Sequence, residues 1–190
     1  MSYLYTKKEE SMNSFHDLIF NRRSIRKYTS EEISPEDVKQ ILEAALVAPS
    51  SKNKMPCQFV IVDDKAALAA LSKCKDFGAK PIEKCALAVV VTADPLVSEA
   101  WIEDASIAAF MMQLQAQDLG LGSCWIQVRE RYSADGSSAE EYVKELLSIP
   151  PDIRVLCILS LGHKDEEKQP YEQDQCKWEK IHIEKWKENE

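Results

Sequence analysis

The chain has 190 residues, 45% of them hydrophobic, and its 24 basic and 32 acidic residues give a net charge of -8. This suffices for one domain with a sizeable core. An acidic chain lacks the broad basic face that binds nucleic acids or anionic membranes, so we expect neither as a partner, and any anion that it binds should be small.

Six cysteines occur without a Cys-x-x-Cys pair, and several lie in apolar runs, where a thiol behaves as a small hydrophobic group. We expect free thiols, no metal site and a reducing, cytoplasmic location, although an even cysteine count also permits three disulfides. Residues 1–13 are polar, resemble no secretory signal, and are predicted to form an exposed arm. No apolar run is long enough to cross a bilayer.

The chain begins with two predicted helices. The first covers residues 13–23, with Asn13 or Ser14 as its cap. The second begins after Ser34, which caps it, places Pro35 at its first position and ends before Pro49. Apolar residues recur in it at helical spacing and predict one buried face.

The middle of the chain alternates strands and helices. Residues 57–64 and 85–94 read as buried strands, and residues 65–77 between them as a helix. Residues 97–119 carry the longest helical pattern, and its second half is apolar all round. Such a helix is buried on every side, which favours a subunit interface or, alternatively, a central helix in a monomer.

The last third predicts an extended segment over residues 123–128, a helix over 138–149 and a strand over 152–162. The polar tail that follows keeps Trp178 and Trp186, so we expect it to pack on another surface, which the partner subunit could supply. This order of elements predicts an α+β or α/β sandwich with a small sheet.

Three segments carry candidate binding chemistry. NRRSIRKY, residues 21–28, holds three of the six arginines, whose forked donors match phosphate oxygens; a solvated basic turn is the alternative. APSSKNKMPCQF, residues 48–59, could present its serines and asparagine to a polar ring or a sugar chain of a ligand. The alternative is an ordinary connection between a helix and a strand. In DLGLGSCWI, Gly120 and Gly122 permit a helix end or a close approach of the backbone to a ligand.

Together with LGHKDEEKQP and the closing IHIEKW, these segments resemble the nitroreductase family of FMN-dependent, NAD(P)H-oxidising enzymes in order and spacing, from about residue 14 to 186. The resemblance implies an α+β fold: a nitroreductase-like α-β-α sandwich with a small mixed sheet, in an intertwined homodimer that holds two FMN molecules at its interface. It implies an FMN-binding domain over residues 14–170. Residues 171–190 would form a C-terminal extension that packs on the domain or on the partner subunit.

The resemblance also implies roles for residues. The first motif would bind the FMN phosphate and ribityl chain, the second would approach the flavin from the other subunit, and the third would lie along the ring. We expect the backbone amide of Gln127 to face flavin N5, and no catalytic side chain, because the flavin carries the hydride. The implied cofactor-binding residues are Arg22, Arg23, Ser24, Arg26, Pro49, Ser50, Ser51, Asn53, Trp125, Ile126, Gln127 and Lys168.

The expected function is the transfer of two electrons from NADH or NADPH to a nitroaromatic, quinone or similar small acceptor by a ping-pong mechanism. Two alternatives on the same fold are another flavin chemistry, such as reductive dehalogenation or flavin modification, and a non-catalytic flavin-binding module. A third alternative lacks flavin, and its arginines bind an acidic partner. Residues 94–101 and 129–142 are the predicted sources of substrate contacts.

Overall fold

The structure is a computed structural model that describes residues 14–186. One four-stranded sheet, with strand order β1-β2-β4-β3, forms its centre. The strands are β1 (Cys57–Val62), β2 (Leu87–Ala93), β3 (Gly122–Gln127) and β4 (Arg154–Gly162).

The sheet is small, as predicted, but its strands pair antiparallel rather than in mixed directions. Within residues 14–186 the parallel pairing consists of one isolated bridge between Ser24 and Ser123. The N-terminal segment thus runs beside β3 in the parallel direction, but it contacts β3 too briefly to form a fifth strand.

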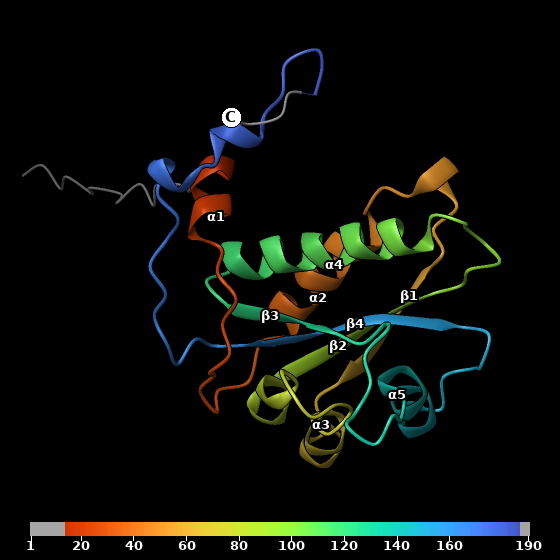
Figure 1. The fold of residues 1–190 in the computed structure, drawn as a ribbon. Helices are drawn as coiled ribbons and strands as arrows, with labels where there is room; N and C mark the ends of the chain where they lie inside the picture. The colour runs from red at the N-terminus through yellow and green to blue at the C-terminus, as the bar shows by residue number, and fades with distance from the viewer. Residues whose placement is uncertain (1–13, 187–190) are drawn as a thin grey trace, which may run out of the picture.

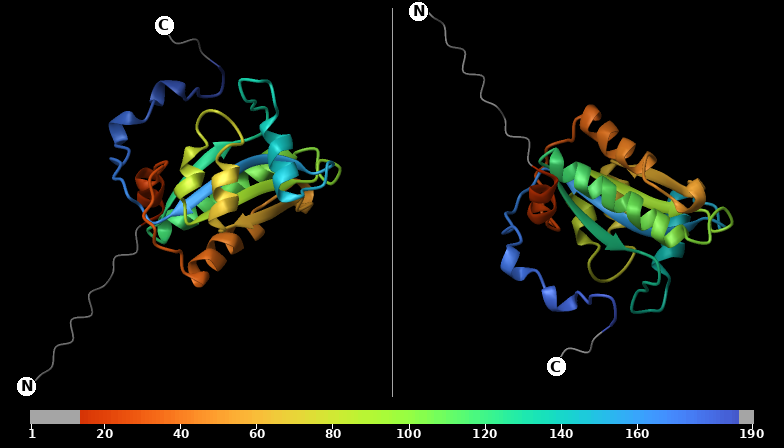
Figure 2. Two further views of the ribbon diagram at one scale, coloured as in Figure 1. Left: turned by 90° about the horizontal axis from the view of Figure 1, so that it is seen from below. Right: turned by 90° about the horizontal axis from the view of Figure 1, so that it is seen from above.

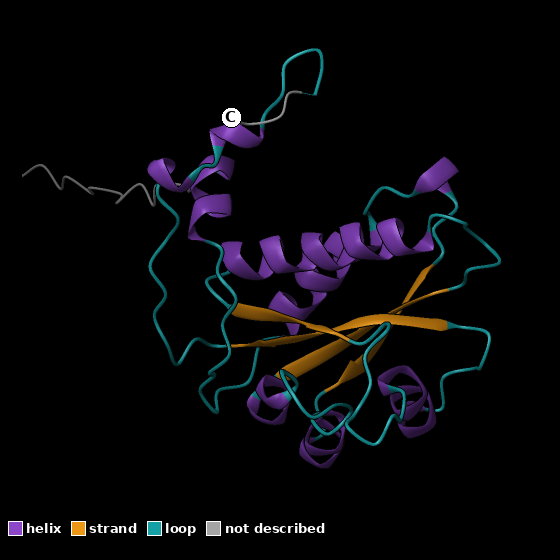
Figure 3. Ribbon diagram, in the orientation of Figure 1, coloured by secondary structure: helices purple, strands orange, loops and turns teal. Residues whose placement is uncertain are grey.

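Helices cover both faces of the sheet, which confirms the predicted α-β-α sandwich (Figures 1 and 3). α2 and α4 lie on one face, while α3 and α5 lie on the other. α1 stands beside the carboxyl end of α4. The helices are α1 (Phe15–Asn21), α2 (Pro35–Leu46), α3 (Lys65–Leu71), α4 (Trp101–Asp118) and α5 (Ala139–Leu147), with short 3-10 turns at Ser51–Asn53, Lys80–Lys84, Gln173–Gln175 and Trp178–Lys180.

The sheet separates two hydrophobic cores because side chains alternate along each strand. On β2, Val89 and Val91 contribute to the core under α2 and α4, whereas Ala88 and Val90 contribute to the core over α3 and α5. All residues of β2 are buried, as expected of a strand with a helical layer on each face.

Capping side chains set the helix starts that the sequence predicts. Ser14 and Asp17 cap α1 reciprocally, and Ser34 accepts the amide of Asp37 at the start of α2, with Pro35 in the first turn. α4, however, begins at Trp101 rather than at residue 97. The preceding residues instead form a turn around Asp94, whose backbone and side-chain oxygens accept their amides.

One face of α4 is uncovered in the single chain (Figure 2). Ile107 and Phe110 on this face are 41% and 44% exposed, so the helix is not buried on every side within one chain. It is therefore not the central helix of a monomer core. Its burial by a second subunit stays a prediction.

Residues 171–186 run along the outside of the domain (Figure 1). Trp178 and Trp186 are 74% and 79% exposed and so do not pack into the core of their own chain. The predicted arm at residues 1–13 lies outside the described residues. All six cysteines are free thiols, so the disulfide alternative is not realised. Within residues 14–186 no helix is both long and apolar enough to cross a membrane.

Candidate functional site

The arginine segment is pinned to the open edge of β3. The amide of Ile25 donates to the Ser123 carbonyl at 2.9 Å, and the Tyr28 hydroxyl donates to the Ile25 carbonyl at 2.6 Å. Ile25 and Tyr28 are 3% and 6% exposed, and burial raises the pKa of Tyr28 well above its ordinary value. These two side chains fix the backbone from which the arginines project.

Two glycines make room for these side chains. A Cβ atom at Gly122 would lie 2.8 Å from Ile25 Cγ2, and one at Gly162 would lie 2.9 Å from Tyr28 Cδ1. Close packing by the arginine segment, not the approach of a ligand, therefore explains Gly122. Gly120 has φ +77° and ends α4, which fits the helix-end alternative.

The arginines divide between two sides of their segment. In an extended backbone the side chains of Arg22, Ser24 and Arg26 share one side. Arg23 lines a cleft with Ile25, two positions on, whereas Arg22, Ser24 and Arg26 do not line it. The guanidinium group of Arg26 turns back to the Ser24 carbonyl, to which it donates at 3.5 Å. Arg23 instead donates to the Gln169 carbonyl.

Arg23 also lies over the ring of Tyr171, with 4.7 Å between the guanidinium carbon and the ring centroid. A cation stacked on an aromatic ring in this way is held in place. The structure thus places the Arg26 guanidinium beside the Ser24 backbone and turns Arg23 toward the tail.

Lys168 approaches the same segment through a carboxylate. Glu166 accepts the amide of Arg26 at 2.6 Å and the Lys168 ammonium at 3.0 Å. The Arg26 amide, helped by Lys168, lowers the pKa of Glu166 against the effect of burial. Glu166 therefore fixes the backbone at Arg26 and holds Lys168 beside it. Glu166 and Lys168 line a cleft of about 750 Å³ together with Arg23 and Lys164.

The hydrogen-bond pattern of β3 sets the direction of the Gln127 backbone. The amide of Val128 donates to the Leu156 carbonyl of β4 at 3.1 Å, and antiparallel pairing uses alternate residues. The N–H and C=O groups of Ser123, Trp125 and Gln127 therefore point to the open edge. The carbonyls of Ser123 and Gln127 accept bonds there, from the amide of Ile25 and from the Lys75 ammonium.

Lys75 is a candidate functional residue that the sequence analysis missed. Its Nζ donates to the Gln127 carbonyl at 2.5 Å, and it lies near Cys124 and Arg131. Burial lowers its pKa, and the charge of Arg131 lowers it further. Nothing in the sequence around Lys75 singles it out, because tertiary folding brings its loop after α3 to the end of β3.

The side chains of β3 do not all face one way. Trp125 donates from its indole nitrogen to Gln127 Oε1 at 2.9 Å, and Gln127 Nε2 donates to the Arg129 carbonyl at 3.1 Å. Trp125 packs against the core under α4, whereas Ile126 is 1% exposed and lies in the opposite core. The side chain of Ile126 therefore does not reach the open edge, and its peptide groups pair with β4 instead.

The predicted loop lies far from the arginines of its own chain. Ser50 Oγ accepts the amide of Met55 at 2.9 Å, while Pro49 and Asn53 are exposed. The amide of Ser51 donates to Asp104 near the amino end of α4. Gln117, near the other end of α4, lines the cleft beside the arginine segment. At 1.5 Å per residue, Asp104 and Gln117 lie about 20 Å apart.

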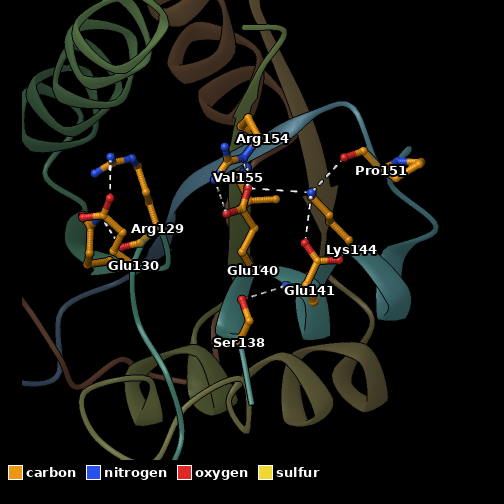
Figure 4. Close-up of polar contacts among 10 residues, drawn as sticks. Arg129, Glu130, Ser138, Glu140, Glu141, Lys144, Pro151, Arg154 and Val155 are labelled. Carbon is orange, nitrogen blue, oxygen red and sulfur yellow. Dashed lines mark hydrogen bonds and ion pairs between the residues drawn. The ribbon is translucent and has the colours of Figure 1, made fainter. Parts of the chain in front are cut away.

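A second basic group lies beyond the end of β3 (Figure 4). The guanidinium carbons of Arg129 and Arg154 lie 6.0 and 5.6 Å from the centroid of the buried Trp101 ring. Arg154 forms two bonds to Glu140, at 2.7 and 2.9 Å, and Glu140 also lies 3.8 Å from Lys144. This network joins α5 to the start of β4. It therefore stabilises β4, the strand that pairs with Gln127 at the end of β3.

Known proteins resemble this chain in sequence and in fold. The sequence pattern described as "Nitroreductase family" matches residues 19–97 and 86–163. A protein of Archaeoglobus fulgidus named as an NADH dehydrogenase/NAD(P)H nitroreductase is 38% identical over 174 residues, which are 89% of this chain and 97% of that protein. The NADPH-flavin oxidoreductase of Vibrio harveyi is 29% identical over 82% of this chain and 68% of its own length.

A solved structure, that of an FMN-dependent nitroreductase from Clostridium difficile R20291, has a TM-score of 0.87 and 45% sequence identity. The match covers 89% of this chain and 98% of that chain. The names of these relatives agree with the predicted NAD(P)H-dependent flavin oxidoreductase and with FMN as its cofactor. Sequence pattern, fold and relatives lead to the same conclusion: the chain belongs to the nitroreductase family.

Proposed function

We propose that the protein uses FMN to pass two electrons from NADH or NADPH to a nitroaromatic, quinone or similar small acceptor by a ping-pong mechanism. The observation that carries this proposal is the arrangement along the open edge of β3. The segment that carries Arg22 and Arg26 pairs with Ser123 at one end, and the outward amide of Gln127 lies beside Lys75 at the other.

The donors fit a molecule with a phosphate at one end and a flat, hydrogen-bonding ring at the other. Ser123 and Gln127 are about 13 Å apart along the strand, at about 3.3 Å per residue. Arg22, Ser24 and Arg26 would bind the phosphate and the ribityl chain, because guanidinium forks and a hydroxyl suit phosphate oxygens. Lys168, held by Glu166, would add a further cation.

At the ring end, the chain supplies donors rather than acids or bases. FMN, when bound, supplies the hydride chemistry. The amide of Gln127 would donate to the N5 side of the ring, and Lys75 would stabilise negative charge that gathers on it. Trp125 and Arg129 hold the Gln127 side chain and so keep this backbone rigid.

We propose a homodimer in which each chain supplies half of two sites. The separation of about 20 Å along α4 keeps the Pro49–Asn53 loop away from the arginines of its own chain. A second copy could bring its loop to the ring, and it would cover Ile107 and Phe110. The extension at residues 171–190 would pack on that copy through its exposed tryptophans. A cytoplasmic location stays a prediction.

The experiment is anaerobic mixing of the purified protein with NADH or NADPH, followed by absorbance. Bleaching of a yellow protein, and recovery of its colour on adding 4-nitrobenzoate or a benzoquinone, are the expected results. Parallel lines in double-reciprocal plots would support the ping-pong order. A yellow protein that neither nicotinamide bleaches would indicate a flavin-binding module, and a colourless protein that ignores added FMN would contradict the proposal.

A further inference from the structure

Asp104 is a buried carboxylate outside the predicted cofactor site. It lies in the first turns of α4 and is 3% exposed. One oxygen accepts the amide of Ser51 at 2.7 Å, and the other accepts the Ser98 hydroxyl at 2.8 Å. The ion pairs of the described chain do not include Asp104. Burying a charge without a counter-ion is costly, and hydrogen bonds offset that cost here.

The loop that Asp104 holds has a backbone that few sequences adopt unaided. Lys52, Asn53 and Met55 have φ angles of 51°, 54° and 48°. A side chain crowds the backbone in this left-handed region, so such residues persist where surrounding contacts fix them. The bond from Met55 to Ser50 Oγ closes the loop on itself, but it does not fix the loop to the domain.

Two side-chain contacts tie the loop to the domain around α4. The ion pair between Lys52 and Glu99, at 3.3 Å, has side chains that are 69% and 82% exposed, so water screens it. The bond from Ser51 to Asp104 is buried and charge-assisted, which makes it the stronger contact. The same carboxylate also fixes Ser98, in the segment from which we expect substrate contacts.

We infer that Asp104 is a positioning residue that holds the Ser50–Met55 loop in the conformation that reaches FMN bound to the other subunit. This inference rests on the proposed function. Because Asp104 accepts the Ser51 amide, the hydroxyl of Ser51 is the group left to bind the ligand. Through Ser98, Asp104 also joins the cofactor loop to the expected substrate loop.

Three variants test the inference. Asp104→Ala removes both acceptors. Asp104→Asn keeps an oxygen for the Ser51 amide and places an NH₂ group against the Ser98 hydroxyl, which can accept a bond. Lys52→Met is the matched control, because it breaks the exposed contact of the same loop. The measurements are the FMN dissociation constant, from quenching of flavin fluorescence, and kcat at saturating FMN.

For Asp104→Ala we expect FMN affinity to fall about tenfold or more, with kcat recovered at saturating FMN, because one charge-assisted bond to the loop is lost. Asp104→Asn should lose less affinity than Asp104→Ala, since it keeps both contacts as neutral hydrogen bonds. Lys52→Met should bind FMN normally. Normal affinity in Asp104→Ala, or equal losses in Asp104→Asn and Asp104→Ala, would overturn the inference.

Hydrogen exchange at the amides of Ser51, Asn53 and Lys54 gives a measurement that does not depend on FMN. We expect these amides to exchange faster in Asp104→Ala than in Asp104→Asn, and equal protection would overturn the inference. If the unchanged protein binds no FMN, the proposed function fails, and exchange alone decides whether Asp104 holds the loop. If Asp104→Ala does not fold, Ser98→Ala replaces it, with faster exchange at Ser51 expected and unchanged exchange contradicting the inference.

Discussion

The ammonium group of Lys75 lies 2.5 Å from the carbonyl oxygen of Gln127, at the open edge of β3. Lys75 lies in the loop after α3, whereas Gln127 ends β3, which follows α4 in the sequence. Burial lowers the pKa of Lys75, yet its bond to a carbonyl needs a donated proton. The N–H of Gln127 points to the same edge, so a cation and an amide donor lie together there.

Replacing Lys75 by methionine should lower the two-electron reduction potential of bound FMN by about 30 mV or more, since 30 mV corresponds to about 1.4 kcal/mol for two electrons. The reduced ring loses a cation that stabilises its charge. The potential is measured by equilibration with a reference dye under argon. The control is Lys73→Met, because Lys73 is an exposed lysine two positions away. This variant should leave the reduction potential unchanged.

Replacing Arg22 and Arg26 by alanine should release FMN and leave the chain folded. Each lost charge-assisted bond should reduce affinity about tenfold to hundredfold. Arg23→Ala tests the division of the arginines, because Arg23 contacts Gln169 and Tyr171 of the tail. It should bind FMN with nearly normal affinity. A loss of affinity in Arg23→Ala as large as that in the double variant would show that this division is wrong.

Gly122→Ala should destabilise the fold by about 1–3 kcal/mol, because the new Cβ overlaps Ile25 and displaces the arginine segment. FMN affinity should fall with it. Gly136→Ala is the contrasting variant: Gly136 has φ +85°, but its Cβ would meet open space. We expect a small loss of stability there and normal FMN binding. Urea unfolding and flavin fluorescence measure both quantities.

Glu140→Gln should reduce stability at neutral pH by about 1–3 kcal/mol, because it leaves Arg154 without its buried partner. Burial alone would raise the pKa of Glu140, but the bonds from Arg154 and Val155 outweigh it and lower the pKa. A lowered pKa means that the stabilisation is complete above about pH 5 and is lost as pH falls through the folded value.

Urea unfolding at several pH values should therefore show the gap between Glu140→Gln and the unchanged protein closing below about pH 4. Glu141→Gln is the control, because that side chain is 69% exposed. A gap that stays constant from pH 7 to pH 3 would contradict the role given to the Glu140 charge (Figure 4).

Local chemistry made much of the fold predictable. Ser34 followed by Pro35 marks a helix start whatever the rest of the chain does, and the apolar runs of β1 and β2 leave few other readings. The start of α4 was not predictable, because side-chain and backbone bonds to Asp94 compete with four more helical residues. The spacing of apolar residues in the sequence does not show whether these turn hydrogen bonds or further helical ones are more stable.

The candidate site was predictable in its segments but not in its contacts. Three arginines in a short extended stretch indicate an anion site, whereas the separation of Arg23 from the others depends on where Tyr171 lies. Lys75 and Asp104 have no sequence signal, since each acts on a residue that is distant in the sequence. Ile126 was included with its neighbours, although strand alternation buries its side chain on the other face.

The alternating amides of β3 have a consequence for how this family member can change. An insertion of one residue between Ser123 and Gln127 would turn the later peptide groups from the open edge toward β4, and the donor that we propose to face the ring would disappear. Substitutions there leave the backbone donors in place. The number of residues between Ser123 and Gln127 is therefore more constrained than the identity of their side chains. A redesign of this strand should change side chains and keep the strand length.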